Sequence, residues 1–569
     1  MSEIETVANP HKVMVLGVDG GTFDLIHPWA DAGLLPTFAR LMREGSWGTL
    51  RTTVPPVTPT AWSSFLTGMN PGKHGLYDFV GRRQGSYQTW LSNASYRSGA
   101  SIWSLLSEAG RRVTVFNVPL TYPIEQVNGL FVSGLLTPTE AVDATWPPEL
   151  LGELRQHVPS FNFSPPGIFS PGEEVAFVQS IADLNESTLQ AARYLMERQP
   201  WDFFMAVFMG VDIAGHFLWR QMVEGRQNDP LAQTPSQARL ANAILDAYRQ
   251  VDAALAELIS AAGPDVHLIV MSDHGFGSLE RYVHVNAWLR QQGYLKLRRT
   301  PWSLLKQAMY GLGITPISVY ETMRRLGLGE RMRRAGRRQS RLIPQLLKRG
   351  FLSFADVDWS RTRLYSIGFA GPIYLNLRGR EPEGVVSAGA EAEALLDRVS
   401  EELRSLRDPE NGQSLVGEIY RREQLYAGHR ADEGPDLVFL PRDMKNGSFG
   451  LMEFGSSRWL TPASDRTGTH RMNGILLMKG PGIRPGVELD ESSITDIAPT
   501  VLALMGVPIP RAMDGHVLTQ AMTDELRSSL DIAPGLPDRG AAPAGPAQDL
   551  ADEDEAALRE HLRGLGYVA

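Results

Sequence analysis

Residues 12–21, KVMVLGVDGG, decide the fold: an apolar run from Lys12 to Val18 is followed at once by Asp19 and two glycines. A short run that is apolar throughout is typical of a strand buried on both faces of a parallel or mixed sheet. Similar runs lie at Val113–Val118, Phe203–Val211, His267–Ser272, Ile373–Leu377, Asp436–Leu440 and Ile475–Met478. Helical patterns alternate with them, at Leu35–Arg43, Ala100–Leu106, Glu186–Arg198, Ser236–Ala261 and Ala390–Leu406. This alternation predicts an α/β fold, a three-layer α/β/α sandwich around a mostly parallel sheet.

The composition excludes several classes of protein. The chain has 569 residues, 43% of them hydrophobic, which suits one large domain with insertions or two to three smaller ones. It has no cysteine, so disulfides, thiolate zinc sites, iron–sulfur clusters and cysteine nucleophiles are excluded. A net charge of −9 argues against nucleic-acid binding driven by bulk charge. The start of the chain has no secretory pattern and the apolar runs are short, so we expect a soluble, cytoplasmic protein.

One stretch of the chain differs strongly in charge from the rest. Residues 291–350 hold 14 Lys or Arg against two Glu, a local charge of +12, so the other residues together carry −21. Apolar helical pieces occur at Trp302–Leu312 and Ile343–Leu347. We interpret residues 291–360 as a basic helical insertion between two parts of an α/β core, 1–290 and 361–530. Three roles stay open: a solvated cap, a lid over an anionic substrate, or peripheral contact with an anionic membrane through 291–350. Residues 531–569 are predicted to be a Pro/Ala/Gly linker and an acidic helical tail.

Carboxylates and imidazoles follow three of the apolar runs. Asp19 follows the run ending at Val18, and Asp212 follows the run ending at Val211, with His216 one helical turn later. Asp273 and His274 follow the run ending at Met271. Singly, each Asp is best explained as a helix N-cap. Because ligands of open α/β sheets bind at the carboxyl ends of the strands, the repeated position predicts that these side chains converge on one site.

His470 is a sixth candidate for this site. It lies in TGTHRMNG, just before the run Ile475–Met478. Three carboxylates with imidazoles suit divalent cations such as Zn²⁺ or Mn²⁺. His267 and His284 are interpreted instead as packing or surface residues.

A hydroxyl-rich segment offers a candidate nucleophile. Residues 57–68, VTPTAWSSFLTG, begin with hydroxyl side chains and continue into a helical pattern. A hydroxyl at a helix N-terminus lies beside free N–H groups that favour a phosphate, and a divalent cation would lower its pKa. An ordinary Ser/Thr N-cap explains the segment equally well.

Five motifs, in this order, resemble the alkaline phosphatase superfamily, most closely its type I phosphodiesterase and nucleotide pyrophosphatase branch. They are VDGG (18–21), TPTAWSSFLTGMNPGKHG (58–75), GVDIAGH (210–216), MSDHGFG (271–277) and GTHRMNG (468–474). Ser492–Gly515 resembles the closing segment of that superfamily. The resemblance extends from about Lys12 to Met522, with the basic insertion as its clearest gap.

The resemblance implies a metal-dependent hydrolase of phosphoric esters. Thr58 matches the nucleophile, which forms a phospho-threonine intermediate, whereas Thr60 is a weaker match. The cofactors implied are two divalent cations, zinc in the first place and manganese in the second, which clamp the attacking and leaving oxygens. One cation would be held by Asp212, His216 and His470, and the other by Asp19, Asp273 and His274.

Substrate and reaction are less sharply defined. The resemblance implies a small phosphate ester as substrate. Phe79, preceded by Asp78, stands where many nucleotide pyrophosphatases have an Asn that holds a phosphate oxygen, and this departure from the family counts against a nucleotide. Lys73, or basic residues of the insertion, are candidates to replace that donor. Phosphomutase or phospho-group transfer is the alternative reaction, and a non-catalytic scaffold is a third hypothesis. The sequence predicts no oligomeric state.

Overall fold

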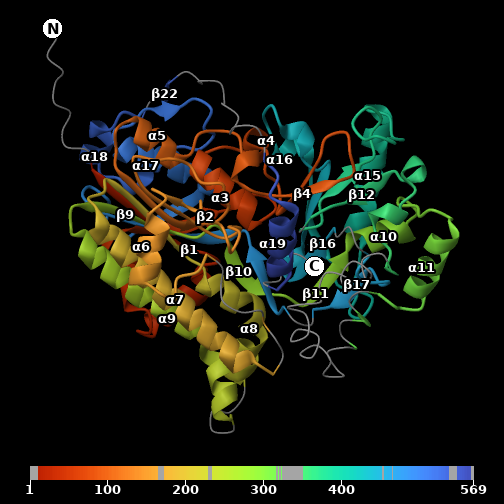
Figure 1. Ribbon diagram of the computed structural model, residues 1–569, viewed down its shortest axis with the longest axis horizontal. Helices are drawn as coiled ribbons and strands as arrows, with labels where there is room; N and C mark the ends of the chain where they lie inside the picture. The colour runs from red at the N-terminus through yellow and green to blue at the C-terminus, as the bar shows by residue number, and fades with distance from the viewer. Residues whose placement is uncertain are drawn as a thin grey trace.

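A nine-stranded sheet forms the centre of the computed structural model, which describes residues 11–163, 169, 172–227, 233–315, 318–319, 322, 350–368, 370–450, 454–463, 466–532, 534–536 and 548–564. The strand order is β20 (Val487–Ser493), β2 (Ser46–Arg51), β19 (Asn473–Lys479), β9 (Val266–Met271), β1 (Lys12–Val18), β8 (Phe203–Phe208), β5 (Val113–Val118), β6 (Gly129–Ser133) and β7 (Thr145–Trp146) (Figure 1). In this sheet β19 and β7 run opposite to the other strands. The mostly parallel sheet expected from the apolar runs is confirmed.

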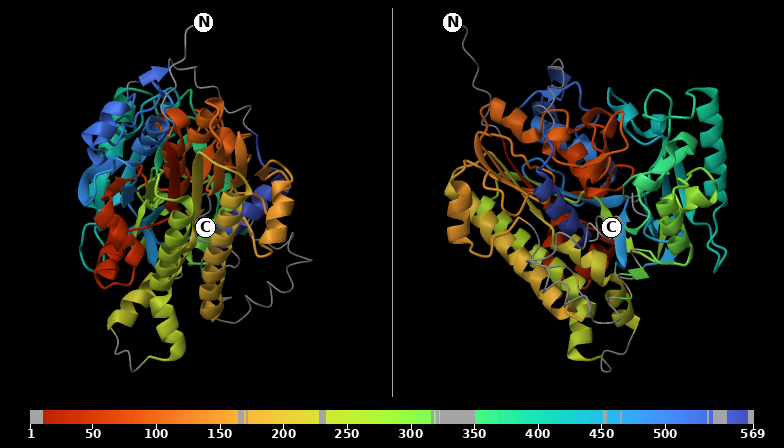
Figure 2. Two further views of the ribbon diagram at one scale, coloured as in Figure 1. Left: turned by 90° about the vertical axis from the view of Figure 1, so that its left-hand side faces the viewer. Right: turned by 45° about the vertical axis from the view of Figure 1, so that its right-hand side comes forward.

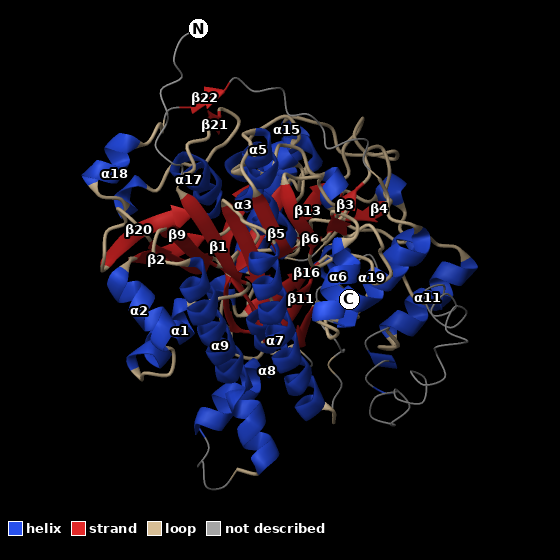
Figure 3. Cartoon of the chain, turned by 60° about the vertical axis from the view of Figure 1, so that its left-hand side comes forward, coloured by secondary structure: helices blue, strands red, loops and turns tan. Residues whose placement is uncertain are grey.

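Helices cover both faces of this sheet, which gives the three layers (Figure 3). One face carries α1 (Phe23–Asp31), α2 (Pro36–Glu44), α7 (Glu174–Arg198), α8 (Gly210–Gln227) and α9 (Pro235–Ala262). The other carries α3 (Thr58–Thr67), α5 (Ile102–Glu108) and α17 (Ile497–Leu504). α6 (Leu150–His157) packs on α7. With helices on both sides, β1, β8 and β9 are buried on both faces, as their uniformly apolar sequences require.

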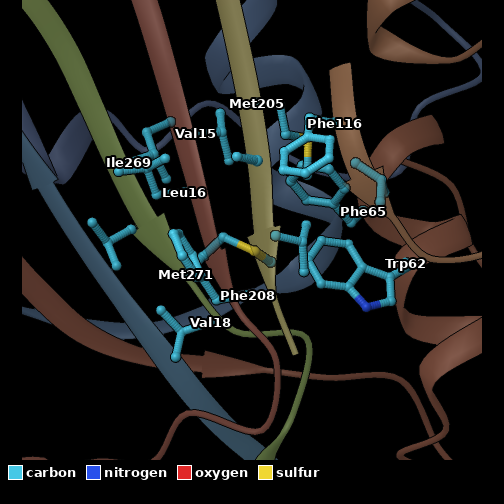
Figure 4. Packing of buried hydrophobic residues seen from close by; sticks show 14 of the residues in the cluster. Val15, Leu16, Val18, Trp62, Phe65, Phe116, Met205, Phe208, Ile269 and Met271 are labelled. Atoms are coloured by element: carbon cyan, nitrogen blue, oxygen red, sulfur yellow. The ribbon is translucent and has the colours of Figure 1, made fainter. Parts of the chain in front are cut away.

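Helix α3 packs unusually closely on the middle of the sheet. Trp62 and Phe65 of this helix lie against the strands in Figure 4, with their ring centroids 5.4 Å apart. A Cβ added at Gly17 of β1 would lie 2.8 Å from the Trp62 ring, so glycine at that position allows the helix to approach. All ten residues of α3 are buried.

A second sheet lies beside the central one and forms its own hydrophobic core (Figure 2). It has the order β12 (Leu364–Ser366), β13 (Ile373–Leu375), β15 (Leu437–Pro441) and β14 (Val416–Arg421), with antiparallel pairing throughout. The apolar runs at 373–377 and 436–440 are therefore strands, but not of the central sheet. They are apolar on both faces because this core includes α15 (Ala390–Ser405) as well.

The remaining elements are short. Small sheets pair β10 (Gly275–Ser278) with β18 (Gly468–Arg471), β3 (Val80–Arg82) with β4 (Thr89–Leu91), and β21 (Ile509–Pro510) with β22 (Pro534–Leu536). A three-stranded sheet has the order β16 (Asn446–Phe449), β11 (Arg281–His284) and β17 (Leu460–Pro462). The short helices are α4 (Pro71–His74), α10 (Val285–Gln291), α16 (Arg422–Leu425) and α18 (Asp524–Ser529).

The expected insertion and tail are both partly described. The helical pattern at Trp302–Leu312 corresponds to α11 (Pro301–Gly311), whereas Ile343–Leu347 lies outside the described residues. The tail forms α19 (Asp552–Gly564), and its Leu558 and Leu562 are buried in the main core. The tail therefore docks on the chain itself, a question that the sequence left open. The division at 290, 360 and 530 stays a prediction. Among the described residues, no helix combines the length and the apolar character needed to cross a bilayer.

Candidate active site

Three adjacent strands direct acidic side chains to one edge of the central sheet. Asp19 comes directly after β1 and Asp273 two residues after its neighbour β9. Asp212 lies near the end of β8, the other neighbour of β1, but not at the strand end, because β8 ends at Phe208. It instead occupies the first turn of α8. All three side chains are fully buried.

Gly20 allows these carboxylates to come together. Its φ of +70° turns the chain after Asp19, a conformation that favours glycine. An added Cβ would lie 3.1 Å from Cα of Asp212, so a larger residue would press on the Asp212 backbone. The backbone N–H of Gly20 also donates to Oδ1 of Asp273 across 3.4 Å.

The first cluster of potential metal ligands comprises Asp212, His216 and His470, whose candidate ligand atoms lie within 4.8 Å of one another. Asp212 and His216 are four residues apart on α8 and therefore share a helix face. Oδ1 of Asp212 lies 3.4 Å from Nε2 of His216 and 3.5 Å from Nε2 of His470. His470 reaches the cluster from β18, where it is paired with Phe276 of β10.

The second cluster comprises Asp19, Asp273 and His274, whose candidate ligand atoms also lie within 4.8 Å of one another. Nε2 of His274 lies 3.3 Å from Oδ2 of Asp273 and 3.6 Å from Oδ1 of Asp19. The same nitrogen is 4.0 Å from Oδ1 of Asp212. The two clusters therefore adjoin, with Asp212 between them.

The three imidazoles share one orientation. Nδ1 of His216 faces the carbonyl oxygen of Gly468 at 3.2 Å, and Nδ1 of His274 faces that of Gly275 at 3.1 Å. Nδ1 of His470 lies 2.8 Å from the carbonyl oxygen of Pro56. A carbonyl only accepts, so Nδ1 of His274 and Nδ1 of His470 carry the proton and their Nε2 atoms face the clusters. This is the usual arrangement of metal-binding histidines. Nη2 of Arg466 lies close to both ring nitrogens of His216, so the Gly468 carbonyl is not the only group that acts on that ring.

The electrostatics of the clusters also favour cations. Burial raises the pKa of Asp19 well above its usual range, and the carboxylates of Asp273 and Asp212 raise it further. Burial likewise raises the pKa of Asp273, with Asp212 as the next cause. Burial lowers the pKa values of His216 and His274, which keeps both rings neutral. Within the described part of the chain, Oδ1 of Asp19 and Oδ2 of Asp273 have no hydrogen-bond partner. Bound cations would relieve the repulsion between the carboxylates and give these oxygens a partner, so the residues present fit a metal.

Thr58 lies at the edge of this constellation. It is the first residue of α3, it is buried, and its Oγ1 is 3.4 Å from Nε2 of His274. The N-cap residue of the helix is Val57, and its side chain makes no capping hydrogen bond. Thr58 is therefore not an N-cap residue. Thr60 is also buried, and its hydroxyl makes no hydrogen bond with any described residue.

Two residues of the site were missed by sequence reasoning. Trp62, one turn after Thr58 on α3, donates from Nε1 to Oδ2 of Asp19 across 3.1 Å. Nη2 of Arg466 lies 2.9 Å from Nε2 of His216. The four-residue spacing of Trp62 from Thr58 on one helix face is the signal that would have found it. Arg466 precedes His470 by four residues in a loop and carries no such signal.

Other singled-out residues lie elsewhere. Nζ of Lys73 binds Oδ1 of Asp514 at 2.5 Å and the carbonyl oxygen of Ala512 at 2.8 Å, so this lysine is engaged away from the clusters. His267 and His284 are buried and bind the Pro481 carbonyl oxygen and the Thr461 hydroxyl, as expected of packing residues.

A pocket adjoins the first cluster. His470, Val57 and Arg466 line it together with residues of β15 and β16. Its wall is largely apolar and aromatic, with Leu279, Phe79, Tyr282, Phe439 and Phe449. Polar side chains on the wall include those of Arg466, Asn446, Ser448, Thr469 and His470.

An α/β sheet with two adjoining, buried Asp/His clusters at its carboxyl edge defines a candidate metal-dependent hydrolase. The model of the type I phosphodiesterase / nucleotide pyrophosphatase family matches residues 13–445, and the chain belongs to this family. It is a phosphoric ester hydrolase of a metal-dependent family.

Solved structures with a similar fold have low sequence identity to the chain. Murine ectonucleotide pyrophosphatase / phosphodiesterase 5 is 12% identical, with a TM-score of 0.46, over 90% of this chain and 100% of that one. An inactive variant of the same murine protein in complex with AMP is 12% identical, with a TM-score of 0.47, over 92% of this chain and 100% of that one. Phosphonoacetate hydrolase from Sinorhizobium meliloti 1021, in complex with phosphonoformate, is 14% identical, with a TM-score of 0.49, over 86% of this chain and 94% of that one. No curated protein sequence matches the chain.

Proposed function

We propose that this chain hydrolyses small-molecule phosphoric esters with Thr58 as the nucleophile and two divalent cations, zinc before manganese. One observation carries the proposal: Oγ1 of Thr58 lies 3.4 Å from Nε2 of His274, beside two adjoining clusters of buried ligands. The donor set of carboxylate oxygens and imidazole nitrogens suits zinc, and the absence of thiolates leaves manganese as the second choice.

Each residue has a defined role in the proposed reaction. Asp212, His216 and His470 hold one cation, and Asp19, Asp273 and His274 hold the other. When bound, the cations supply Lewis-acid stabilisation of the phosphoryl oxygens and lower the pKa of the Thr58 hydroxyl. Deprotonated Thr58 attacks phosphorus, the bond from phosphorus to the leaving alcohol oxygen breaks, and a phospho-threonine forms. Water then cleaves this intermediate, releasing phosphate or a phosphate monoester and restoring the hydroxyl.

Two features of the chain itself assist this step. Thr58 begins α3, so the positive end of that helix dipole lies beside the negatively charged phosphoryl group. Arg466 lies on the pocket wall next to His216, where its guanidinium is placed to bind a phosphoryl oxygen. We therefore assign to Arg466 the role that the sequence suggested for Lys73.

The pocket supports a preference for the alcohol part of the substrate. Phe79, Phe439 and Phe449 form a largely apolar wall next to His470. An apolar or aromatic alcohol would bury its surface there, whereas a polar one would lose hydrogen bonds to water. We propose aryl or alkyl phosphate esters as the substrate class.

Replacement of the nucleophile tests the proposal. Thr58→Ala should lower turnover of an aryl phosphate ester by about 10³-fold or more while the metal content stays near two per chain. Thr58→Ser should retain part of the activity, and acid-quenched enzyme should yield a peptide phosphorylated at Thr58. Thr60→Ala is the matched control and should stay active. Full activity of Thr58→Ala would refute the assignment.

Transfer to an acceptor is the competing reaction. It was suggested by the basic insertion, of which residues 323–349 lie outside the described part, so no structural observation favours it. Product analysis with added alcohols or sugars separates the two, because a hydrolase releases phosphate without an acceptor and a strict transferase does not.

A further inference from the structure

Helix α11 exposes apolar side chains to solvent and buries polar ones. Its apolar Trp302, Leu304 and Leu305 are 57%, 50% and 49% exposed, whereas Ser303 and Lys306 are buried. Leu312, directly after the helix, is 80% exposed. Five of the eight large apolar residues that are exposed in the described part of the chain fall between positions 302 and 314. Such a concentration on α11 and the residues directly after it marks a binding surface, because single exposed apolar residues are otherwise scattered.

Buried polar contacts fix this orientation of the helix. Nζ of Lys306 lies 2.9 Å and 3.2 Å from the two carboxylate oxygens of Asp356, and both side chains are almost fully buried. Tyr310, also buried, donates its hydroxyl proton to the carbonyl oxygen of Ser456, and the Arg290 guanidinium lies over its ring. Rotating the helix to bury Leu304 and Leu305 would break the Lys306–Asp356 pair inside the protein, which is costly. The outward apolar face is therefore built into the structure.

Two positively charged residues flank this face in the described part of the chain. Arg298 and Arg299 precede the helix and are exposed. Figure 1 places α11 at the outer edge of the molecule. An apolar face with tryptophan and flanking cations is the pattern of helices that lie in the interface of an anionic bilayer.

We propose that the α11 surface, defined as Arg298, Arg299, Trp302, Leu304, Leu305, Leu312 and Ile314, binds peripherally to an anionic lipid bilayer. A second copy of the chain fits less well, because a symmetric contact would place the same arginines against each other. The lipid surface offers both an apolar interior for the leucines and negative headgroups for the arginines.

Vesicle cosedimentation of the full chain tests this proposal. Phosphatidylcholine vesicles containing phosphatidylserine should bind the protein at low salt, pure phosphatidylcholine vesicles should bind it about tenfold less, and added salt should weaken the binding. The double variant Trp302→Ser/Leu305→Ser should lose about tenfold in partitioning. Val142→Ser is the matched control, because Val142 is 79% exposed and lies elsewhere in the chain.

Each other occupant gives a distinct result. If the chain's own residues 316–349 cover α11, the double variant is less stable to urea and wild type does not bind vesicles, which overturns the proposal. If a second copy of the chain covers α11, sedimentation shows a dimer for wild type and a monomer for the double variant. Wild type then does not bind vesicles, which also overturns the proposal. Thr58→Ala should bind vesicles like wild type, so the docking surface and the proposed nucleophile fail or succeed independently.

Discussion

The Nε2 atoms of His216 and His470 lie 3.0 Å apart, while the Nδ1 atoms of both rings face backbone carbonyl oxygens. Oδ1 of Asp212 lies 3.4 Å from the first of these nitrogens and 3.5 Å from the second. A cation bound between these three atoms would be coordinated by all of them. The stability and the metal content of the protein should therefore be linked.

Removing one ligand should remove one cation. His470→Ala takes a ligand from the first cluster and leaves Asp19, Asp273 and His274 intact, so bound zinc should fall from near two to near one per chain by elemental analysis. Zinc at about 100 times its dissociation constant should stabilise wild type by about 2.7 kcal/mol, and His470→Ala by less, as measured by urea unfolding. His284→Ala is the control; if it lost metal as well, the assignment of ligands would be wrong.

Trp62 should tune the affinity of the second cluster. Its indole N–H holds Oδ2 of Asp19, which leaves Oδ1 for a cation. Trp62→Phe keeps an aromatic ring at this position and removes the donor, so affinity for one cation should fall by about 10–100-fold in a chelator competition. Trp103→Phe is matched, because Trp103 is fully buried and its Nε1 has no hydrogen-bond partner among the described residues. Equal effects of the two substitutions would reduce Trp62 to a packing residue.

Phe449 should set part of the substrate preference. Its ring lies 4.8 Å from that of Tyr282 on the pocket wall. Phe449→Ala should raise KM for an aryl phosphate ester by about two- to tenfold, because one aromatic contact is lost. The KM of the corresponding methyl ester, which does not reach that wall, should not change. A parallel rise for both esters would mean that the substitution disturbs the metal centre instead.

His267 should make the metal-free protein sensitive to acid. Burial lowers the pKa of this histidine from 6.5 to about 4. A folded-state pKa below the unfolded value means that stability is fully present above about pH 6.5 and is lost as pH falls toward about 4. His267→Gln, which keeps a donor for the Pro481 carbonyl oxygen, should flatten the decline of the urea midpoint between about pH 7 and pH 5 in chelator. The exposed His516→Gln should leave the decline unchanged.

The backbone pattern made much of the site predictable. Asp19 and Asp273 follow runs whose ends agree with β1 and β9 to within a residue, so their meeting at one sheet edge followed from parallel pairing. Asp212 was expected at a strand end and lies on a helix instead. The run Phe203–Val211 hides that boundary, since the end of β8 and the start of α8 are both buried and therefore both apolar.

Long-range contacts were not predictable in the same way. The bond from Trp62 to Asp19 and the position of Arg466 beside His216 join residues 43 and 250 positions apart. Helical spacing places Trp62 on the same face as Thr58, but it does not tell which distant residue the indole reaches. The strands Ile373–Leu375 and Leu437–Pro441 were recognised as buried, but an apolar pattern does not say in which sheet a strand is buried. The outward apolar face of α11 depends on the ion pair between Lys306 and Asp356. These residues are distant in sequence, so the sequence pattern does not predict the pair.

The strand order around β1 also determines when the site can form during synthesis of the chain. β1 is flanked by β8 and β9, roughly 190 and 250 residues downstream, and His470 arrives only when β18 pairs with β10. During synthesis, therefore, the chain must be made as far as β18 before the third proposed ligand of the first cluster is present. A product that ends before β18 would keep Asp19, Asp273 and His274 but lack His470, so we expect it to bind metal at the second proposed site and not at the first.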